Sequence, residues 1–249
     1  HHRYSQDQDS APNFHIDINK VHDPVPKVEP LSKHGNPKKY TVLGHTYYLR
    51  STYLNYDETG IASWYGMKFH SFRTSSGELY DVAGMTAANK VLPIPCYAYV
   101  TNLKNGKRVI VKINDRGPFH ENRIIDLSYV AAAKLGIWPK GTGLVRVQTI
   151  DPREWQPENS SSRAESVPIS HKPRIYMQIG AFRSYDNAQN LAKRIHELSN
   201  HPIHIETTTW HESPIYKVQI GPLETVDTSD QLYKLLEKEH LGNPMTVIK

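Results

Sequence analysis

One short pattern occurs twice in the last third of the chain and constrains the fold more than any other feature. The segments Tyr176–Phe182 (YMQIGAF) and Lys217–Leu223 (KVQIGPL) align on their glycines, and a helix-like run follows each of them. Further strand-like runs lie near residues 203–210 and 245–248. The repeat therefore predicts the order βαββαβ, which is a small sheet with helices on one face.

The two predicted helices are amphipathic. The first is expected to begin at Ser184, and the second is expected to open with a capping box at Thr228–Gln231. Their apolar faces should pack on the sheet. The residues expected on those faces are Ala188, Leu191, Ala192, Ile195, Leu198, Leu232, Leu235 and Leu236.

One face of this sheet is left open by the predicted helices. Because side chains alternate along a strand, the apolar set belongs under the helices, namely Met177, Ile179, Val218 and Ile220. The opposite face then carries Tyr176, Gln178, Lys217 and Gln219. Two interpretations stay open for these four residues: a solvated sheet face, or a platform that hydrogen-bonds sugar hydroxyls and acetamides.

The middle of the chain is predicted to be mostly β structure. Residues 40–49 (YTVLGHTYYL) are rich in β-branched and aromatic residues around a Gly-His break, which is typical of a hairpin. Further strand-like runs follow at residues 60–65, 96–102, 108–113 and 143–150, and an Asn-Gly pair between the second and third of these predicts another hairpin. A small barrel is the natural closure for so many short strands.

Helical pattern in this middle region is limited. It covers residues 127–135, and Gly136 is expected to end that helix. A second short helix is expected at Thr86–Lys90.

Two further segments lack the features of a folded domain. Residues 1–39 carry scattered prolines among polar and charged residues and are predicted to be extended or disordered. Residues 151–173 lose periodicity and gain serine, proline and charge, which predicts a flexible linker. The chain of 249 residues is thus expected to hold two domains, at residues 40–150 and 174–249.

Composition adds a few limits. The net charge of +5 and the pI near 9.1 favour an anionic partner such as a cell-wall polymer, a membrane surface or nucleic acid. The single cysteine, Cys96, excludes an internal disulfide and a cysteine-based metal site, and its apolar surroundings predict a buried thiol. No apolar run approaches 18 residues and no charged-then-apolar leader is visible, so no spanning helix is expected.

A predicted strand, Val111–Asp115, ends at an acid. The turn after it can present the carboxylate to a groove on a rigid scaffold. Arg116 is expected to brace this turn or to pair with Asp126, and it is also a candidate substrate contact. Asp126 is expected to cap the helix that follows. Trp64 and Tyr65 either stack on sugar rings or pack in an aromatic core.

The sequence shows no motif for metal binding, phosphate binding or serine-nucleophile catalysis. The histidines form no metal-ligand template, and the sequence has neither a glycine-rich phosphate loop nor a serine-nucleophile motif. No metal and no cofactor are expected.

Several segments resemble known families. The runs IYMQIGAFRSYDNAQNLAKRI and YKVQIGPL resemble the signature strands of SPOR domains, which bind peptidoglycan whose glycan strands have lost their stem peptides. The segments GIASWYG, TSSGELYDVAGMTAA, LPIPCYAYVTNLKNGK, VKINDRGPF and RIIDLS resemble, in that order, the double-psi β-barrel of the rare lipoprotein A (RlpA) family. Together the two resemblances cover residues 40–150 and 174–249, and the pairing of barrel and SPOR domain is also that family's arrangement.

The resemblance implies an activity and its residues. Characterised members are lytic transglycosylases, which cleave peptide-free glycan between MurNAc and GlcNAc and form 1,6-anhydroMurNAc. Glu78 and Asp115 correspond to the family's essential acids, with Asp115 as general acid and then base and with Glu78 orienting substrate or stabilising charge.

Asn89 is a departure from the family and is kept as a candidate catalytic residue. The family usually has a histidine at this position of the TAANK segment, and asparagine cannot titrate near neutral pH. Three explanations stay open: this chain works without the histidine, it has reduced or no activity, or the residue has been changed.

Location and partners are also implied by the resemblance. It predicts a periplasmic monomer at the division septum, anchored in the outer membrane by a lipid on a cysteine upstream of His1, with denuded glycan strands as the partner. A glycan-binding protein whose barrel has lost its chemistry is the alternative. RNA binding is disfavoured because the repeat strand Lys217–Leu223 lacks aromatic residues for base stacking.

Overall fold

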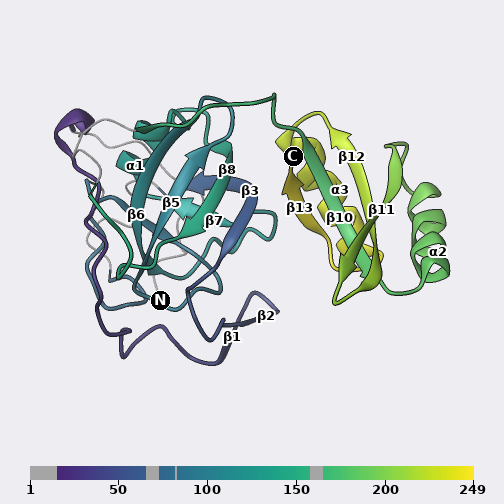
Figure 1. Cartoon of the computed structure of the whole chain (residues 1–249), viewed down its shortest axis with the longest axis horizontal. Coiled ribbons are helices and arrows are strands. Elements are labelled where there is room, and N and C mark those ends of the chain that lie inside the picture. Colours follow the sequence, from purple (N-terminus) through teal and green to yellow (C-terminus); the bar gives the residue numbers. More distant parts are fainter. Residues whose placement is uncertain (1–15, 66–72, 82, 158–164) are drawn as a thin grey trace. The chain divides into compact units, whose positions relative to one another are not determined.

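The computed structural model describes residues 16–65, 73–81, 83–157 and 165–249, and the chain divides into two compact units between Lys172 and Pro173 (Figure 1). Each unit has its own sheet and its own buried core. Among the helices that the structure describes, none has the length and apolar character needed to cross a membrane.

The first unit contains a closed barrel of six strands, which confirms the predicted double-psi fold class. The strands are β3 (Asp57–Trp64), β4 (Thr86–Ala88), β5 (Cys96–Asn102), β6 (Lys107–Asp115), β7 (Ile125–Leu127) and β8 (Thr142–Thr149). Their order is β4-β7-β3-β8-β5-β6, and a pairing between β4 and β6 closes the barrel. The β3–β7 and β4–β6 pairings are parallel. As a result, the ends of β4 and β6 meet, and Ala88 lies opposite Asp115.

Apolar side chains fill the barrel, since alternate residues of each strand face inward. The largest fully buried ones include Leu92, Ile94, Ile113, Ile125, Leu127, Leu135 and Ile137. Helix α1 (Tyr129–Leu135) packs on this core through Val130 and Leu135. Its left-handed C-cap residue is Gly136, with a φ of 75°, which confirms the predicted end of this helix.

Two local predictions in the barrel are wrong. Thr86–Lys90 was expected to be helical, but Thr86–Ala88 is the strand β4, because pairing with β6 on one side and β7 on the other outweighs local propensity. Asp126 was expected to cap α1, but it lies within β7 and accepts a hydrogen bond from the Ser63 hydroxyl at 3.3 Å. The N-cap is Ser128, which accepts from the Ala131 N–H.

The segment before the barrel lies along its surface (Figure 1). It contains the short 3-10 helix η1 (Ile18–Lys20) and the hairpin of β1 (Lys39–Val42) and β2 (His45–Tyr48), which confirms the hairpin predicted there. Asp23 accepts from the Ile110 N–H at 3.1 Å, and Glu29 accepts from the Tyr97 hydroxyl at 2.6 Å. The described part of this segment is thus extended but held to the barrel, and residues 1–15 lie outside the described residues.

Part of the predicted flexible linker is also structured. Strand β9 (Glu165–Ser166) pairs antiparallel with β6, and its glutamate binds the guanidinium of Arg108. The indole N–H of Trp155 donates to the Tyr99 hydroxyl at 3.0 Å. The edge of β6 beyond the barrel offers unpaired backbone groups, and the returning chain uses them. Residues 158–164 lie outside the described residues.

The second unit has the predicted βαββαβ order. Its elements are β10 (Ile175–Phe182), α2 (Tyr185–His196), β11 (Ile203–Trp210), β12 (Ser213–Leu223), α3 (Val226–Lys238) and β13 (Met245–Ile248), and the sheet order is β11-β12-β10-β13. Met177, Ile179, Val218 and Ile220 are buried in its core, as alternation predicted.

The helices of this unit match the predictions at the start of α2 but differ at the end of α2 and at the start of α3. Ser184 caps α2 by accepting from the Asn187 N–H, which confirms the predicted start. The cap of α3 is Thr225, so the predicted capping box begins three residues too late. Leu198 follows the end of α2 and is 39% exposed, so its predicted place on the buried face is wrong.

Candidate functional site

Asp115 ends β6 and is the centre of the candidate active site. It is only 4% exposed. Its Oδ1 accepts from the backbone N–H of Ser75 at 2.9 Å, from the Ser75 hydroxyl at 2.7 Å and from the N–H of Arg116 at 2.8 Å. Three donors on one oxygen stabilise the ionised carboxylate and fix its orientation, whereas burial opposes ionisation.

Glu78 also lies near the end of β6, but it contacts other residues than Asp115 does. Its Oε1 lies 2.8 Å from the Lys112 Nζ, and its Oε2 accepts from the Asn114 amide at 3.1 Å. These two partners precede Asp115 on the same strand. The Glu78 side chain is 42% exposed. One loop, residues 74–78, thus brings Ser75 to the buried acid and Glu78 to the exposed side.

Asn89 is used inside the fold. It is 2% exposed, and its Oδ1 accepts from the N–H groups of Val91 at 2.8 Å and Leu92 at 2.9 Å. Its Nδ2 donates to the Ile124 carbonyl at 3.2 Å and lies 3.5 Å from the Tyr56 hydroxyl. An amide offers two donors and one oxygen with two lone pairs, and all are engaged here. The side chain therefore braces the turn after β4, which argues against the catalytic role considered for it.

Arg116 braces the turn after Asp115, and its role as a substrate contact stays a prediction. It is 6% exposed, and burial lowers its pKa. Its guanidinium donates to four oxygens, which are the carbonyls of Gly35 (3.0 Å), Leu92 (2.5 Å) and Asn89 (3.2 Å) and the side-chain oxygen of Asn36 (3.1 Å). These bonds support the brace interpretation rather than the alternative ion pair with Asp126.

The two candidate aromatic contacts pack against other aromatic residues. Tyr65 is 2% exposed, and its ring meets Tyr80 edge-on at 4.7 Å, so it is wrong as an open sugar contact. Trp64 is half-buried and meets Tyr129 edge-on at 6.1 Å. The core interpretation therefore holds for Tyr65, and Trp64 packs partly in the same way.

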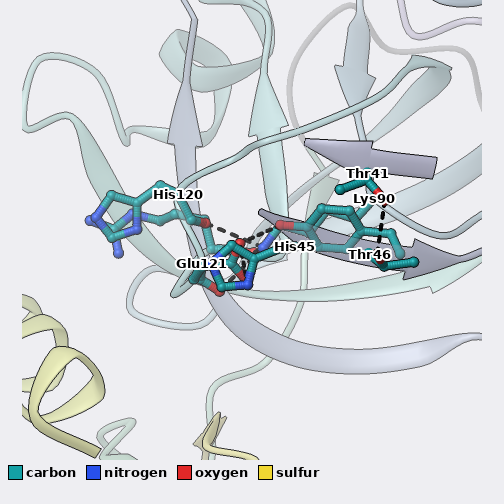
Figure 2. Close-up of polar contacts among 8 residues, drawn as sticks. Thr41, His45, Thr46, Lys90, His120 and Glu121 are labelled. Carbon is teal, nitrogen blue, oxygen red and sulfur yellow. Dashed lines mark hydrogen bonds and ion pairs between the residues drawn. The ribbon is translucent and has the colours of Figure 1, made fainter. Parts of the chain in front are cut away.

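Sequence reasoning missed Lys90, which holds the segment after Asp115. Its ammonium donates to the carbonyls of His120 at 3.2 Å, Glu121 at 3.2 Å and Arg123 at 2.8 Å. Glu121 also binds the hydroxyl of Tyr47. Its Oε1 lies 3.7 Å from the Nδ1 of His45 (Figure 2). The only sequence signal was its position next to Asn89. Lys90 thus ties the hairpin of β1 and β2 and the segment 120–123 together.

Lys90 predicts a pH dependence of stability. Burial lowers its pKa from 10.5 to about 8. Between these pH values the unfolded chain binds more protons than the folded chain, so this group makes the free energy of unfolding rise with pH. Between pH 7.5 and 9.5 we expect the parent to gain on the order of 1 kcal/mol relative to Lys90→Met in urea unfolding. Lys104→Met changes an exposed lysine, so the parent should gain no stability relative to this variant over the same pH range. An equal gain of the parent relative to both variants would contradict the prediction.

The open sheet face of the second unit differs from the prediction at one residue. Tyr176, Gln178 and Lys217 are half-buried, but Gln219 is 2% exposed and is wrong as an open platform residue. The His204 Nε2 lies 3.2 Å from its Oε1, and the Lys249 ammonium binds the same oxygen. That ammonium also lies 4.8 Å from the centre of the Tyr176 ring. Side chains from β11 and the end of the chain therefore cover Gln219.

The described residues offer neither a metal site nor a reactive thiol. Among them, no group of three or more His, Cys, Asp or Glu side chains is placed to hold a metal ion. Cys96 is buried, and burial raises its pKa to about 12. A thiol with so high a pKa is a poor nucleophile.

Comparison with known families defines the class of this protein. Residues 57–149 match the family described as Lytic transglycolase, and residues 172–247 match the SPOR domain family. The barrel, with its acid at the end of β6, is therefore the domain of a lytic transglycosylase, and the βαββαβ unit is a SPOR domain.

Individual relatives narrow the class to one family. The "Endolytic peptidoglycan transglycosylase RlpA" of Pseudomonas aeruginosa (strain UCBPP-PA14) is 35% identical, over 96% of this chain and 84% of the relative. The proteins of the same name from Vibrio cholerae serotype O1 and Neisseria meningitidis serogroup A are 37% and 40% identical, over 92% and 80% of this chain and 83% and 79% of the relatives. This chain belongs to the RlpA family of endolytic peptidoglycan transglycosylases.

Proposed function

We propose that this chain cleaves peptide-free peptidoglycan strands between MurNAc and GlcNAc and leaves 1,6-anhydroMurNAc ends. The observation that carries the proposal is the placement of Asp115, which ends β6 in a barrel matched as Lytic transglycolase and is held by three hydrogen-bond donors. Such a fixed acid at the end of a strand is suited to proton transfer.

Asp115 performs both proton transfers in this reaction. Its protonated carboxyl donates to the leaving glycosidic oxygen as the bond from the anomeric carbon breaks. The resulting carboxylate then takes the proton of the MurNAc 6-hydroxyl, whose oxygen bonds to the anomeric carbon and closes the anhydro ring. No water is consumed, so one carboxyl group is sufficient. Because Asp115 is 4% exposed, glycan binding has to uncover it.

Glu78 has a different role in the proposal. Its exposed carboxylate is held by Lys112 and Asn114, which fixes it at the surface of the barrel near the end of β6. There it orients the sugar by hydrogen bonds or stabilises positive charge on the ring.

The SPOR domain supplies binding in the proposal. Half-buried Tyr176, Gln178 and Lys217 offer an aromatic ring, an amide and an ammonium on one sheet face. These groups suit the hydroxyls and acetamides of denuded glycan at the septum. A lipid on an upstream cysteine would anchor the periplasmic monomer in the outer membrane, and the SPOR domain would raise the local glycan concentration at the barrel.

A digest of sacculi tests this function. Sacculi stripped of stem peptides by an amidase are incubated with the purified chain, and the soluble products are analysed by mass spectrometry. We expect peptide-free oligosaccharides with anhydroMurNAc ends, and far fewer of them from untreated sacculi. Products with reducing MurNAc ends would indicate hydrolysis, and an absence of soluble glycan would reject the enzyme.

The alternative is a glycan-binding protein with an impaired barrel, and Asn89 favours it. The family's usual histidine is replaced here by a side chain whose hydrogen bonds are all internal. This alternative predicts that the chain sediments with denuded sacculi but releases nothing. The variant Asn89→His then distinguishes loss of the histidine from a wider defect, since it should restore product release only in the first case.

A further inference from the structure

A segment before the barrel packs directly against the candidate active site. The Ser32 hydroxyl donates to the carbonyl of Ser76 at 2.7 Å, and the Ser32 N–H donates to the carbonyl of Ile94 at 3.0 Å. Asn36 exchanges hydrogen bonds with the backbone of Ile94 at 2.7 and 2.9 Å and accepts from Arg116 at 3.1 Å. We call residues 32–36 the strap. These contacts join positions far apart in the sequence, so they fix the strap on the barrel.

Gly35 brings the strap closest to the site. Its φ is +83°, and a Cβ at this position would lie 2.5 Å from the carbonyl oxygen of Ser75. Its own carbonyl accepts from the Arg116 Nε at 3.0 Å. A side chain at residue 35 would therefore both strain the backbone and push Ser75 away. Only glycine permits this close approach.

Ser75 faces the strap with its carbonyl and faces Asp115 with its two donors. The N–H and the hydroxyl both bind Oδ1 of Asp115, at 2.9 and 2.7 Å, and the hydroxyl oxygen also accepts from the Arg116 N–H at 3.3 Å. Since Oδ1 already accepts from three donors, a proton on the carboxyl is best placed on Oδ2. The hydroxyl of Ser75 is therefore one of three donors that together disfavour a proton on Oδ1.

We propose that Ser75 is a positioning residue for Asp115 and that the strap, through Gly35, holds Ser75 in place. The kinetic part of this inference rests on the proposed function. The strap then belongs to the active-site scaffold, although the sequence predicted it to be part of an extended or disordered segment.

Ser75→Ala, Ser75→Thr and Ser76→Ala in the full chain test the role of Ser75. Ser75→Ala should lower kcat about 10- to 100-fold with a nearly unchanged KM, and should move the alkaline limb of the rate profile to higher pH, because one donor to the carboxylate is lost. Ser75→Thr keeps a hydroxyl and should retain most of the rate. Ser76→Ala removes a neighbouring hydroxyl that lies 3.0 Å from the Thr74 hydroxyl, and it should behave as the parent. Equal kcat and equal pH profiles for Ser75→Ala and the parent would overturn the inference.

A readout without turnover separates this inference from the proposed function. The Asp115 carboxyl is titrated by carbon NMR in the parent and in Ser75→Ala. We expect the titration midpoint to rise in Ser75→Ala, whether or not the parent releases glycan. An unchanged midpoint rejects the positioning role, whereas a shifted midpoint in a chain that releases no product rejects only the enzyme.

The strap is tested with two glycines of matched backbone. Gly35 and Gly44 have φ values of +83° and +81°, but a Cβ at Gly44 would meet nothing within 4 Å. Gly35→Ala should therefore shift the Asp115 midpoint as Ser75→Ala does, while Gly44→Ala carries similar backbone strain without that shift. Equal midpoints for both glycine variants would show that the strap does not act on Ser75, and circular dichroism of each variant verifies its fold.

Discussion

Asp115→Asn is expected to release anhydroMurNAc products at least about a hundredfold more slowly than the parent chain. The carboxamide has the size of the carboxyl group, and its oxygen can still accept from the N–H groups of Ser75 and Arg116. It cannot donate a proton to the glycosidic oxygen or take one from the 6-hydroxyl. The rate is measured on amidase-treated sacculi at saturating substrate. Sedimentation with sacculi should be unchanged, because the substitution leaves intact the SPOR domain to which the proposal assigns binding.

The control for this prediction is another aspartate of the same barrel. Asp57→Asn removes a surface carboxylate that pairs with Arg146 at 2.6 Å and is 46% exposed. This variant should keep the parent's rate. If Asp115→Asn also keeps the rate, Asp115 is not the proton donor, and Glu78→Gln then shows whether the exposed acid carries the reaction.

Arg116→Met is expected to have the largest effect on stability, with a loss of about 3 kcal/mol or more in the free energy of unfolding. The methionine fills part of the space but leaves four buried oxygens without their donor. These are the oxygens of Gly35, Asn36, Asn89 and Leu92. Each buried acceptor that loses its hydrogen bond costs about 1 to 3 kcal/mol, and the sum is reduced because some gain water. Urea unfolding followed by far-ultraviolet circular dichroism measures the loss.

A second arginine serves as a control that distinguishes the effect of losing buried hydrogen bonds from the effect of losing a positive charge. Arg146→Met removes an arginine that makes a two-point pair with Asp57 at the surface, where its side chain is 46% exposed. Exposed pairs contribute about 0 to 1 kcal/mol, so this loss should be small. Similar losses for the two variants would mean that the four buried acceptors do not depend on Arg116.

The local patterns that were predicted correctly share one physical basis. Alternation along Tyr176–Phe182 and Lys217–Leu223 placed the buried apolar residues, since a strand's geometry repeats every two residues. Ser184 and Gly136 were assigned as caps, because capping depends on side chains within a few residues of a helix end. Thr86–Lys90 failed because β4 is made by pairing with two strands remote in sequence.

The burial of the site residues could not be predicted from such local patterns. Alternation put Gln219 on the helix-free face correctly, but it could not show that His204 and Lys249 cover that face. Likewise the TSSGE segment indicated a loop before Glu78, without any sign that Ser75 would bind Asp115. Such contacts depend on which segments remote in sequence pack together. The local periodicity of the sequence carries no information about this packing.

By itself the sequence determined the strand and helix order of the second domain, the family, and the acids worth testing, because these follow from local periodicity and from motifs in a fixed order. Only the tertiary structure decided which polar groups are available. It buries Asn89 and Arg116 in internal hydrogen bonds, leaves Glu78 exposed, and sets Gly35 against Ser75. The reason is that the solvation and partners of a polar side chain are fixed by the packing of strands and loops that lie dozens of residues apart.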